Sequence, residues 1–205
     1  MKWEALLAPY AQVVEELKVK LKGMRAQFRH ESMHSPIEFI TGRVKPVKSM
    51  LEKASSKEID PEDFGRMELE LQDIAGLRIV CQFVDDIYTV VEMIRDRKDL
   101  KVLEEIDYIE KNKESGYRSY HMIVEYPVET IHGMKLVIAE IQIRTLAMNF
   151  WASNEHSLKY KYKGSIPADI KERLRGAAEA AFKLDEEMSK IKHEIQEAHR
   201  IFYRT

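Results

Sequence analysis

Polar side chains alternate with apolar ones in the segment from Lys135 to Arg144. In an extended strand, Glu140, Gln142 and Arg144 point to one face, and the aliphatic residues between them point to the other. The polar face therefore presents a carboxylate, an amide and a guanidinium group. The alternative is an ordinary solvated face on an edge strand.

A second carboxylate, Asp73, precedes the segment from Leu77 to Phe83, which is dense in aliphatic residues and is predicted to be a strand carrying Arg78. Magnesium prefers oxygen ligands and usually relies on one or two carboxylates together with substrate phosphates. Asp73 and Glu140 are therefore the predicted Mg²⁺ ligands. The alternative for Asp73 is a cap of a helix or turn.

Basic residues surround a helix that is predicted to start at Pro46 and to end near Ala54. A helix N-terminus attracts anions through its free N–H groups and its dipole. Lys45, Ser49 and Lys53 are spaced by four residues and share one face of this segment, and Arg43 lies just before it. These side chains could converge on one polyphosphate, or form an ordinary charged helix face. The chain has no Walker-type glycine loop, which excludes a P-loop enzyme.

The loop from Lys111 to His121 offers a different set of contacts. Its lysines, including Lys113, could bind phosphates, and an exposed Tyr117 could stack on a nucleobase. His121 could form a hydrogen bond to a substrate. The alternative is a solvated loop that leads into a strand.

The rest of the chain predicts an α/β fold with a single mixed sheet and helices packed on it and at its ends. Apolar residues recur at steps of four and three from Trp3 to Phe28 and again from Ile170 to Phe202, which predicts two long terminal helices. Their apolar stripes either cover the central domain or, at the C-terminus, join subunits. The expected organisation is a helical segment over residues 1–34, an α/β core over 35–163 and a C-terminal helix over 164–205. The other predicted elements are a helix at 86–97, strands at 100–103 and 119–126, a hairpin turn at His132-Gly133 and a helix at 145–162.

Composition, net charge and cysteine count limit the classes of function that are expected. The chain has 205 residues, 44% of them hydrophobic, and a net charge of −2, so any phosphate binding must come from local clusters. The single cysteine, Cys81, is expected in the core, and it excludes a disulfide framework and a four-cysteine zinc site. No apolar stretch approaches transmembrane length, so a cytoplasmic protein without a membrane partner is expected.

One motif points to a different chemistry. The residues His30-Glu31-Ser32-Met33-His34 match a zinc-protease pattern, which needs a stable helix and a third metal ligand. Ser35-Pro36 follows at once and disfavours a continuing helix. We therefore expect no zinc at these histidines.

Five segments in a fixed order resemble the synthetase domain of the Rel/SpoT homologue family, and in particular the small alarmone synthetases of the RelQ type. The resemblance covers nearly the whole chain and is far more specific than any one of its motifs. The segments are Ser35-Pro36-Ile37-Glu38-Phe39, Thr41-Gly42-Arg43-Val44-Lys45-Pro46, Gln72-Asp73-Ile74-Ala75-Gly76-Leu77-Arg78, Glu114-Ser115-Gly116-Tyr117-Arg118-Ser119-Tyr120-His121, and Glu140-Ile141-Gln142-Ile143-Arg144-Thr145 with Asn149-Phe150-Trp151-Ala152.

The resemblance implies a nucleotidyltransferase-like synthetase fold and transfer of pyrophosphate from ATP to the 3′-hydroxyl of GDP or GTP. It implies Mg²⁺ at Asp73 and Glu140, with Glu140 also drawing the proton from the hydroxyl and Arg78 assisting catalysis. Tyr117 would stack on the guanine. The residues implied for ATP are Arg43, Lys45, Ser49, Lys53 and Arg78, and those implied for the acceptor are Lys113, Tyr117, His121, Gln142 and Asn149.

The resemblance also implies a homotetramer whose central cleft binds pppGpp as an allosteric activator. The matching positions are Lys22, Arg25, Phe39, Thr41 and Asn149. The chain contains no His-Asp pair of the kind found in the hydrolase domains of bifunctional relatives, so synthesis without degradation is expected. The chain departs from the family pattern at Ser55-Ser56, at Ile106 and in the segment 60–71. These departures bear on how ATP is bound and which acceptor is preferred.

Two other functions remain open at this point. The fold could bind guanine nucleotides or single-stranded RNA as a regulatory module without turnover, although the intact pair Asp73 and Glu140 argues against an inactive enzyme. It could also be a nucleotidyltransferase with another acceptor, which the loop around Tyr117 disfavours. The sequence does not rank GDP, GTP and GMP as acceptors.

Overall fold

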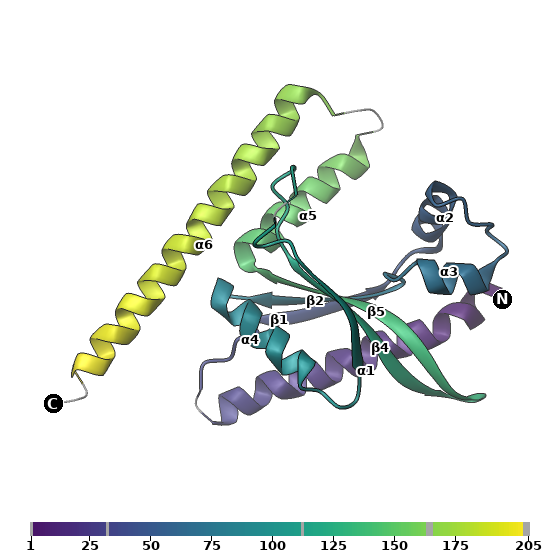
Figure 1. Cartoon of the computed structure of the whole chain (residues 1–205), viewed down its shortest axis with the longest axis horizontal. Helices are drawn as coiled ribbons and strands as arrows, with labels where there is room; N and C mark the ends of the chain where they lie inside the picture. The colour runs from purple at the N-terminus through teal and green to yellow at the C-terminus, as the bar shows by residue number, and fades with distance from the viewer. Residues whose placement is uncertain (1, 32, 112, 163–165, 203–205) are drawn as a thin grey trace.

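The computed structural model describes residues 2–31, 33–111, 113–162 and 166–202, which form one five-stranded sheet and six helices (Figure 1). The strand order is β1-β2-β5-β4-β3, in which β2 and β5 are parallel and the other neighbours are antiparallel. The predicted α/β class with a single mixed sheet is therefore confirmed. The elements are α1 (Lys2–His30), β1 (Phe39–Val44), α2 (Val47–Ser56), α3 (Phe64–Glu70), β2 (Ala75–Cys81), α4 (Val84–Arg95), β3 (Lys101–Asp107), β4 (Tyr120–Thr130), β5 (Gly133–Thr145), α5 (Leu146–Lys161) and α6 (Ala168–Phe202).

The apolar stripe of α1 packs against one face of the sheet, as the sequence predicted. Tyr10, Val14 and Leu17 are at most 3% exposed, and α1 contacts β1, β2, β4 and β5. Each such side chain removed from water contributes about 1.5–3 kcal/mol. Gly42 on β1 allows this close approach, because a Cβ atom there would lie 2.7 Å from Cγ1 of Val14. Helix α4 shares the same core, which leaves the opposite face of the sheet free for polar side chains.

Several boundaries differ from the predicted ones. Strand β2 covers 75–81 instead of 77–83, because Ala75 and Gly76 pair with both β1 and β5. Phe83 instead precedes α4, where its backbone N–H donates to the carboxylate of Asp86 at 3.4 Å. Pro46 is the N-cap of α2 with ψ 139°, not its first helical residue. The short elements β1 and α3 were not predicted, and β3 extends to Asp107.

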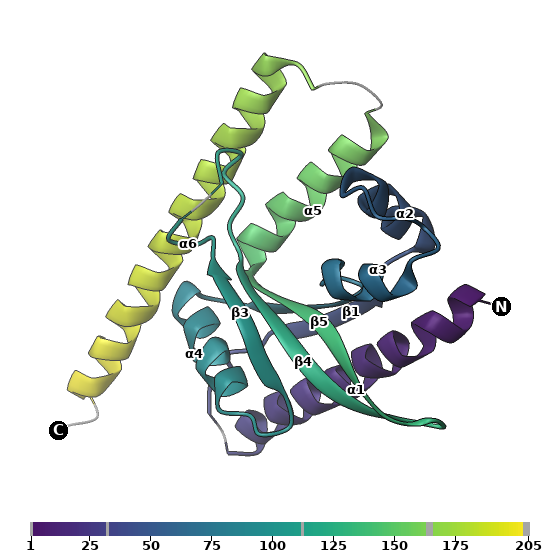
Figure 2. The same ribbon diagram turned by 45° about the vertical axis from the view of Figure 1, so that its right-hand side comes forward.

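Helix α6 presents only part of its predicted stripe to the rest of the chain: Ala181 packs against the small core around Trp151 and Ala178. It lies beside α5, away from α2 (Figures 1 and 2). Its most buried residues, Ala178 and Asp185, lie on a neighbouring face and are 3% and 5% exposed. The interpretation that the stripe covers the central domain is therefore wrong for its outer part. The outer residues Leu184, Met188, Ile191 and Ile195 are 39–56% exposed.

The structure also shows where the single cysteine and a histidine of the zinc-protease pattern lie. Cys81 is buried, as expected, and burial raises the pKa of its thiol. His34 lies with Nε2 3.1 Å from the carboxylate of Asp86, and the described residues contain no group of three or more potential His, Cys, Asp or Glu metal ligands. No helix in the described part of the chain is long and apolar enough to cross a membrane.

Buried Asp185 makes the stability of the fold depend on pH. Burial raises the pKa of its carboxyl to about 6, even though Thr145 donates a hydrogen bond to it. An aspartate in the unfolded chain titrates near about 3.9. The native state therefore binds the extra proton, and its contribution to the free energy of unfolding is full below about pH 4 and is lost as the pH rises through about 6.

We predict that Asp185→Asn is more stable than the wild type at pH 8, by up to about 3 kcal/mol, and that this gain shrinks towards pH 4. Urea unfolding at one protein concentration between pH 4 and 8 measures it. Asp169→Asn, an exposed change on the same helix, is the control and should show no such trend. A difference between Asp185→Asn and wild type that is constant with pH would contradict the prediction.

Candidate active site

The polar face of the sheet gathers side chains from three adjacent strands. The register pairs Arg43 with Gly76 and Gly76 with Glu140, and it pairs Thr41 with Arg78 and Arg78 with Gln142. Because paired residues project to the same side of a sheet, these side chains form neighbouring rows. Gly76 has no side chain, so the space between Arg43 and Glu140 stays open.

That space is a cavity of about 240 Å³ on the face opposite α1. It brings together most of the residues that the sequence predicted for ATP and the metal, including both carboxylates. Ser49 and Lys53 of α2 do not line it, although Lys53 reaches Asp73, which does. The lining residues are Thr41, Gly42, Arg43, Lys45, Asp73, Gly76, Leu77, Arg78, Glu140 and Gln142.

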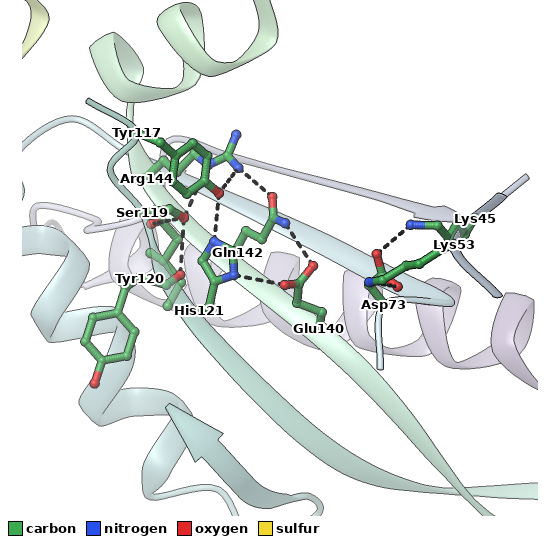
Figure 3. Close-up of polar contacts among 11 residues, drawn as sticks. Lys45, Lys53, Asp73, Tyr117, Ser119, Tyr120, His121, Glu140, Gln142 and Arg144 are labelled. Carbon is green, nitrogen blue, oxygen red and sulfur yellow. Dashed lines mark hydrogen bonds and ion pairs between the residues drawn. The ribbon is translucent and has the colours of Figure 1, made fainter. Parts of the chain in front are cut away.

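Asp73 holds two lysines at one edge of the cavity. Lys45 Nζ donates to Oδ2 at 2.6 Å, and Lys53 Nζ donates to Oδ1 at 2.9 Å (Figure 3). Burial of Asp73 opposes its ionisation, but these two hydrogen bonds keep the pKa of its carboxyl below the usual value. Asp73 is therefore a carboxylate at neutral pH and keeps two ammonium groups side by side at the mouth of β2.

Glu140 belongs to a closed ring of hydrogen bonds (Figure 3). His121 Nδ1 lies 2.9 Å from Oε1 of Glu140, and Gln142 donates to Oε2 at 2.8 Å. Arg144 donates to both Gln142 and the hydroxyl of Tyr117, at 2.7 and 2.6 Å, and that hydroxyl lies 2.7 Å from His121 Nε2. Burial of Glu140 opposes ionisation, but His121 keeps the pKa of the Glu140 carboxyl lowered. The ring fixes the direction of this carboxylate.

A second cavity, of about 390 Å³, adjoins the first and shares Arg43, Arg78 and Gln142 with it. Tyr117 lines this second cavity, with the Arg144 guanidinium 5.1 Å and the Lys113 ammonium 5.2 Å from its ring centre. The sequence predicted an exposed tyrosine, but this side chain is only partly exposed. The other lining residues are Arg144, Ala152, Ser153, Glu155 and His156.

Arginine side chains meet where the two cavities join. Burial, followed by the nearby charges of Arg144 and Arg43, lowers the pKa of Arg78. One terminal nitrogen of Arg78 donates to Asn149 Oδ1 at 3.1 Å, whereas its buried Nε has no hydrogen-bond partner. Like charges held this close are stabilised by an anion, so the junction is suited to phosphate groups.

Sequence reasoning missed four residues of this site. Arg144 was placed on the polar face but was given no role, and Glu155, Ser153 and His156 were not considered. The signal for the last two was present, because Asn149, Ser153 and His156 recur at steps of four and three on α5, and this spacing puts them on one face of the helix.

The residues predicted to bind an activator lie on several different elements. Phe39 and Thr41 project from β1 on the same face as Arg78, at the open end of the sheet. Lys22 is exposed near the end of α1, where Arg25 lies 4.0 Å from Glu38. Asn149 contacts Arg78 from α5. These residues therefore come from α1, β1 and α5, and among them only Thr41 lines either of the two cavities described above.

Comparisons with known proteins identify relatives of this chain. Residues 42–165 match the family described as a region found in RelA/SpoT proteins. The chain is 61% identical to the GTP pyrophosphokinase YjbM of Bacillus subtilis over 98% of its own length and 94% of that protein. The crystal structure of small alarmone synthetase 1 from B. subtilis bound to its product pppGpp covers 95% of this chain and 98% of that one, with a TM-score of 0.90 and 61% identity. The same protein bound to AMPCPP covers 96% and 98%, with a TM-score of 0.83 and 57% identity.

Proposed function

Since the chain belongs to the RelA/SpoT family, we propose that it is a (p)ppGpp synthetase, which transfers pyrophosphate from ATP to the 3′-hydroxyl of GDP or GTP. The 3′-oxygen attacks the β-phosphorus of ATP, the bond from that phosphorus to the α–β bridging oxygen breaks, and AMP leaves. The observation that carries this proposal is the cavity where two carboxylates face a cluster of basic side chains, next to a second cavity lined by an aromatic ring.

The first cavity suits the polyphosphate of ATP. Arg43 and Arg78 would bind the transferred phosphates at the junction of the cavities, and Lys45 and Lys53 would bind them from the side of α2. Ser49 is proposed as a further contact from α2. In phosphoryl transfer the protein contributes mainly by positioning the substrates and neutralising charge, and this set of residues provides both.

Asp73 and Glu140 would hold Mg²⁺. Both line the same cavity, both offer oxygen ligands, and the pKa of each carboxyl is lowered, so both are ionised at neutral pH. A pair of carboxylates fits magnesium, which completes its coordination with water and phosphate oxygens. The bound ion would neutralise charge on the phosphates.

The second cavity suits the acceptor nucleotide. Tyr117 would stack on the guanine, and Glu140, held by His121 and Gln142, would accept the proton of the 3′-hydroxyl. Lys113 and Asn149 are proposed to help place the acceptor. The shared position of Arg78 and Gln142 between the cavities supports in-line placement of the two substrates.

Incubation with ATP and Mg²⁺ plus GMP, GDP or GTP, followed by chromatographic separation, tests the proposal. We expect AMP together with a 3′-diphosphorylated product for GDP or GTP. The alternative is a regulatory module that binds guanine nucleotides or single-stranded RNA without turnover. Tight binding of GDP without any AMP would establish that alternative and exclude the synthetase.

We further propose that the chain acts as a homotetramer that is activated by pppGpp, with residues 164–205 forming part of the subunit contact. Two features support assembly: β1 ends the sheet as an edge strand, and the outer stripe of α6 is exposed in one subunit. Unpaired edges and exposed apolar patches are usually covered by a partner. A cleft between subunits would bring together the activator residues of several chains, with Lys22 and Arg25 for phosphates and Phe39 for the base.

Phe39→Ala is therefore expected to keep basal synthesis but to lose activation. In the wild type, initial rates should rise sigmoidally with GDP, and added pppGpp should shorten any lag, because product binding in the cleft favours the active state. In the variant both responses should flatten. Ile131→Ala, which removes an apolar side chain that is 96% exposed at the hairpin tip, is the control. A monomer by light scattering, or wild-type rates indifferent to pppGpp, would contradict this part of the proposal.

A further inference from the structure

The inner face of α6 holds the loop that carries Tyr117. Gly116 adopts φ +84°, and a Cβ atom at this position would lie 2.5 Å from Cβ of Ala178. The loop backbone therefore lies directly on α6. Ala178 is 3% exposed, so its methyl group fills the contact and leaves no room for a larger side chain.

Arg118, on the other side of Tyr117, is anchored to the same helix. Its guanidinium carbon lies 4.0 Å from the ring centre of Phe182, and a terminal nitrogen lies 3.6 Å from a carboxylate oxygen of Glu179. Arg118 is only 9% exposed. Both chain neighbours of Tyr117 are thus fixed by consecutive turns of α6, and this limits where the tyrosine ring can lie.

Two further contacts fix α6 relative to the rest of the second cavity. The Thr145 hydroxyl donates to buried Asp185 at 2.7 Å and accepts from the backbone N–H of Met148, where β5 passes into α5. The Trp151 indole donates to the carbonyl oxygen of Leu174 at 2.9 Å. The helix therefore holds both walls of this cavity: the loop with Tyr117 and the start of α5.

We propose that α6 sets the position of Tyr117, and that Ala178 and Phe182 are positioning residues for the acceptor nucleotide but not for ATP. This inference rests on the proposed function, because it assigns the second cavity to the acceptor. The lysines proposed for ATP belong to the segment that leads into α2 and to α2 itself, which lies on the opposite side of the molecule from α6 (Figure 1). A displacement of α6 should therefore reach the acceptor first.

The test uses the full chain and two probes, GDP and α,β-methylene ATP, whose affinities are measured separately by calorimetry. Ala178→Val should push the Gly116 loop away from α6, and Phe182→Ala should remove the surface under Arg118. We expect each to raise the Kd of GDP and the acceptor KM about tenfold, because displacing the Tyr117 ring removes part of its stacking on the base. The Kd of the ATP analogue should stay within about twofold.

A matched variant controls for the helix itself. Ala177→Val makes the same change at the exposed neighbouring position and should behave as wild type. Circular dichroism checks folding, and if Ala178→Val does not fold, Phe182→Ala decides alone. Equal losses for both probes, or unchanged GDP binding in folded variants, would overturn the inference.

The affinity measurements also distinguish this inference from the proposed reaction. A wild type that binds GDP but transfers nothing would remove the synthetase reaction, and the Kd values would still decide the role of α6. A wild type with no affinity for GDP would overturn both.

Discussion

Glu140→Gln and Asp73→Asn are each expected to lower pyrophosphate transfer on the order of a thousandfold, the equivalent of several kcal/mol of lost charge stabilisation. Each change keeps the size of the side chain but removes a negative oxygen ligand. Asp73→Asn also leaves Lys45 and Lys53 without their shared carboxylate, so phosphate binding at these lysines should not weaken. The loss should therefore appear in kcat more than in the KM for ATP.

Initial rates over a range of Mg²⁺ concentrations measure this effect, with circular dichroism to check the fold. Glu129→Gln is the matched control, because it removes one negative charge from an exposed position on β4, next to β5. It should leave kcat unchanged. Near wild-type turnover by either active-site variant at ordinary Mg²⁺ would show that the site has been assigned wrongly.

Tyr117→Ala should weaken acceptor binding far more than ATP binding. Stacking of a base on an aromatic ring is worth about 1–3 kcal/mol, which corresponds to a loss of roughly 5- to 150-fold in acceptor affinity. Tyr117→Phe separates the ring from the hydroxyl. It keeps the stacking surface but removes the group that contacts both His121 and Arg144. We therefore expect a near-normal acceptor KM and a lower kcat.

Calorimetric titration with GDP and with α,β-methylene ATP, together with steady-state kinetics, resolves these two effects. Tyr162→Ala, which removes a half-exposed tyrosine at the end of α5, is the control for loss of a ring. If Tyr117→Ala weakened both nucleotides equally, Tyr117 would not be the guanine platform.

The alternation in β5 was sufficient to predict which residues face the site. Period-2 patterns specify faces directly, so Glu140 and Gln142 could be grouped from the sequence alone. The hydrogen-bond and strand partners of these residues could not be predicted from the sequence, because these partners depend on strand register. Only the parallel pairing of β2 with β5 shows that Gly76 lies next to Glu140 and opens the cavity. For the same reason the ring that joins Glu140 to Tyr117 through His121 was not predictable.

The short elements were harder to predict than the long ones. Strand β1 has six residues, includes Gly42 and lies at the end of the sheet, so its apolar signal is weak. The heptad-like stripe of α6 predicted a helix correctly but not the face that packs. Small and polar residues such as Ala178 and Asp185 make that contact, and they carry little hydropathy signal.

The two cavities meet at one row of paired side chains on the polar face of the sheet. The parallel pair β2 and β5 places Arg78 beside Gln142, where both cavities meet. The helices on the opposite face supply the core, and α2 and α5 flank the polar face with charged and amide side chains. The proposed positioning of the substrates therefore depends on strand register more than on any single loop.

In the proposed reaction, an intact pyrophosphate group is transferred to the 3′-oxygen of the acceptor. The most direct measurement is ³¹P NMR of the reaction with ATP and Mg²⁺, run with GDP and in parallel with 3′-deoxy-GDP. We predict one AMP for each new diphosphate on the 3′-oxygen of GDP, and no transfer to the 3′-deoxy analogue. Formation of ADP or inorganic phosphate in place of AMP, or a phosphorylated product from 3′-deoxy-GDP, would contradict this reaction.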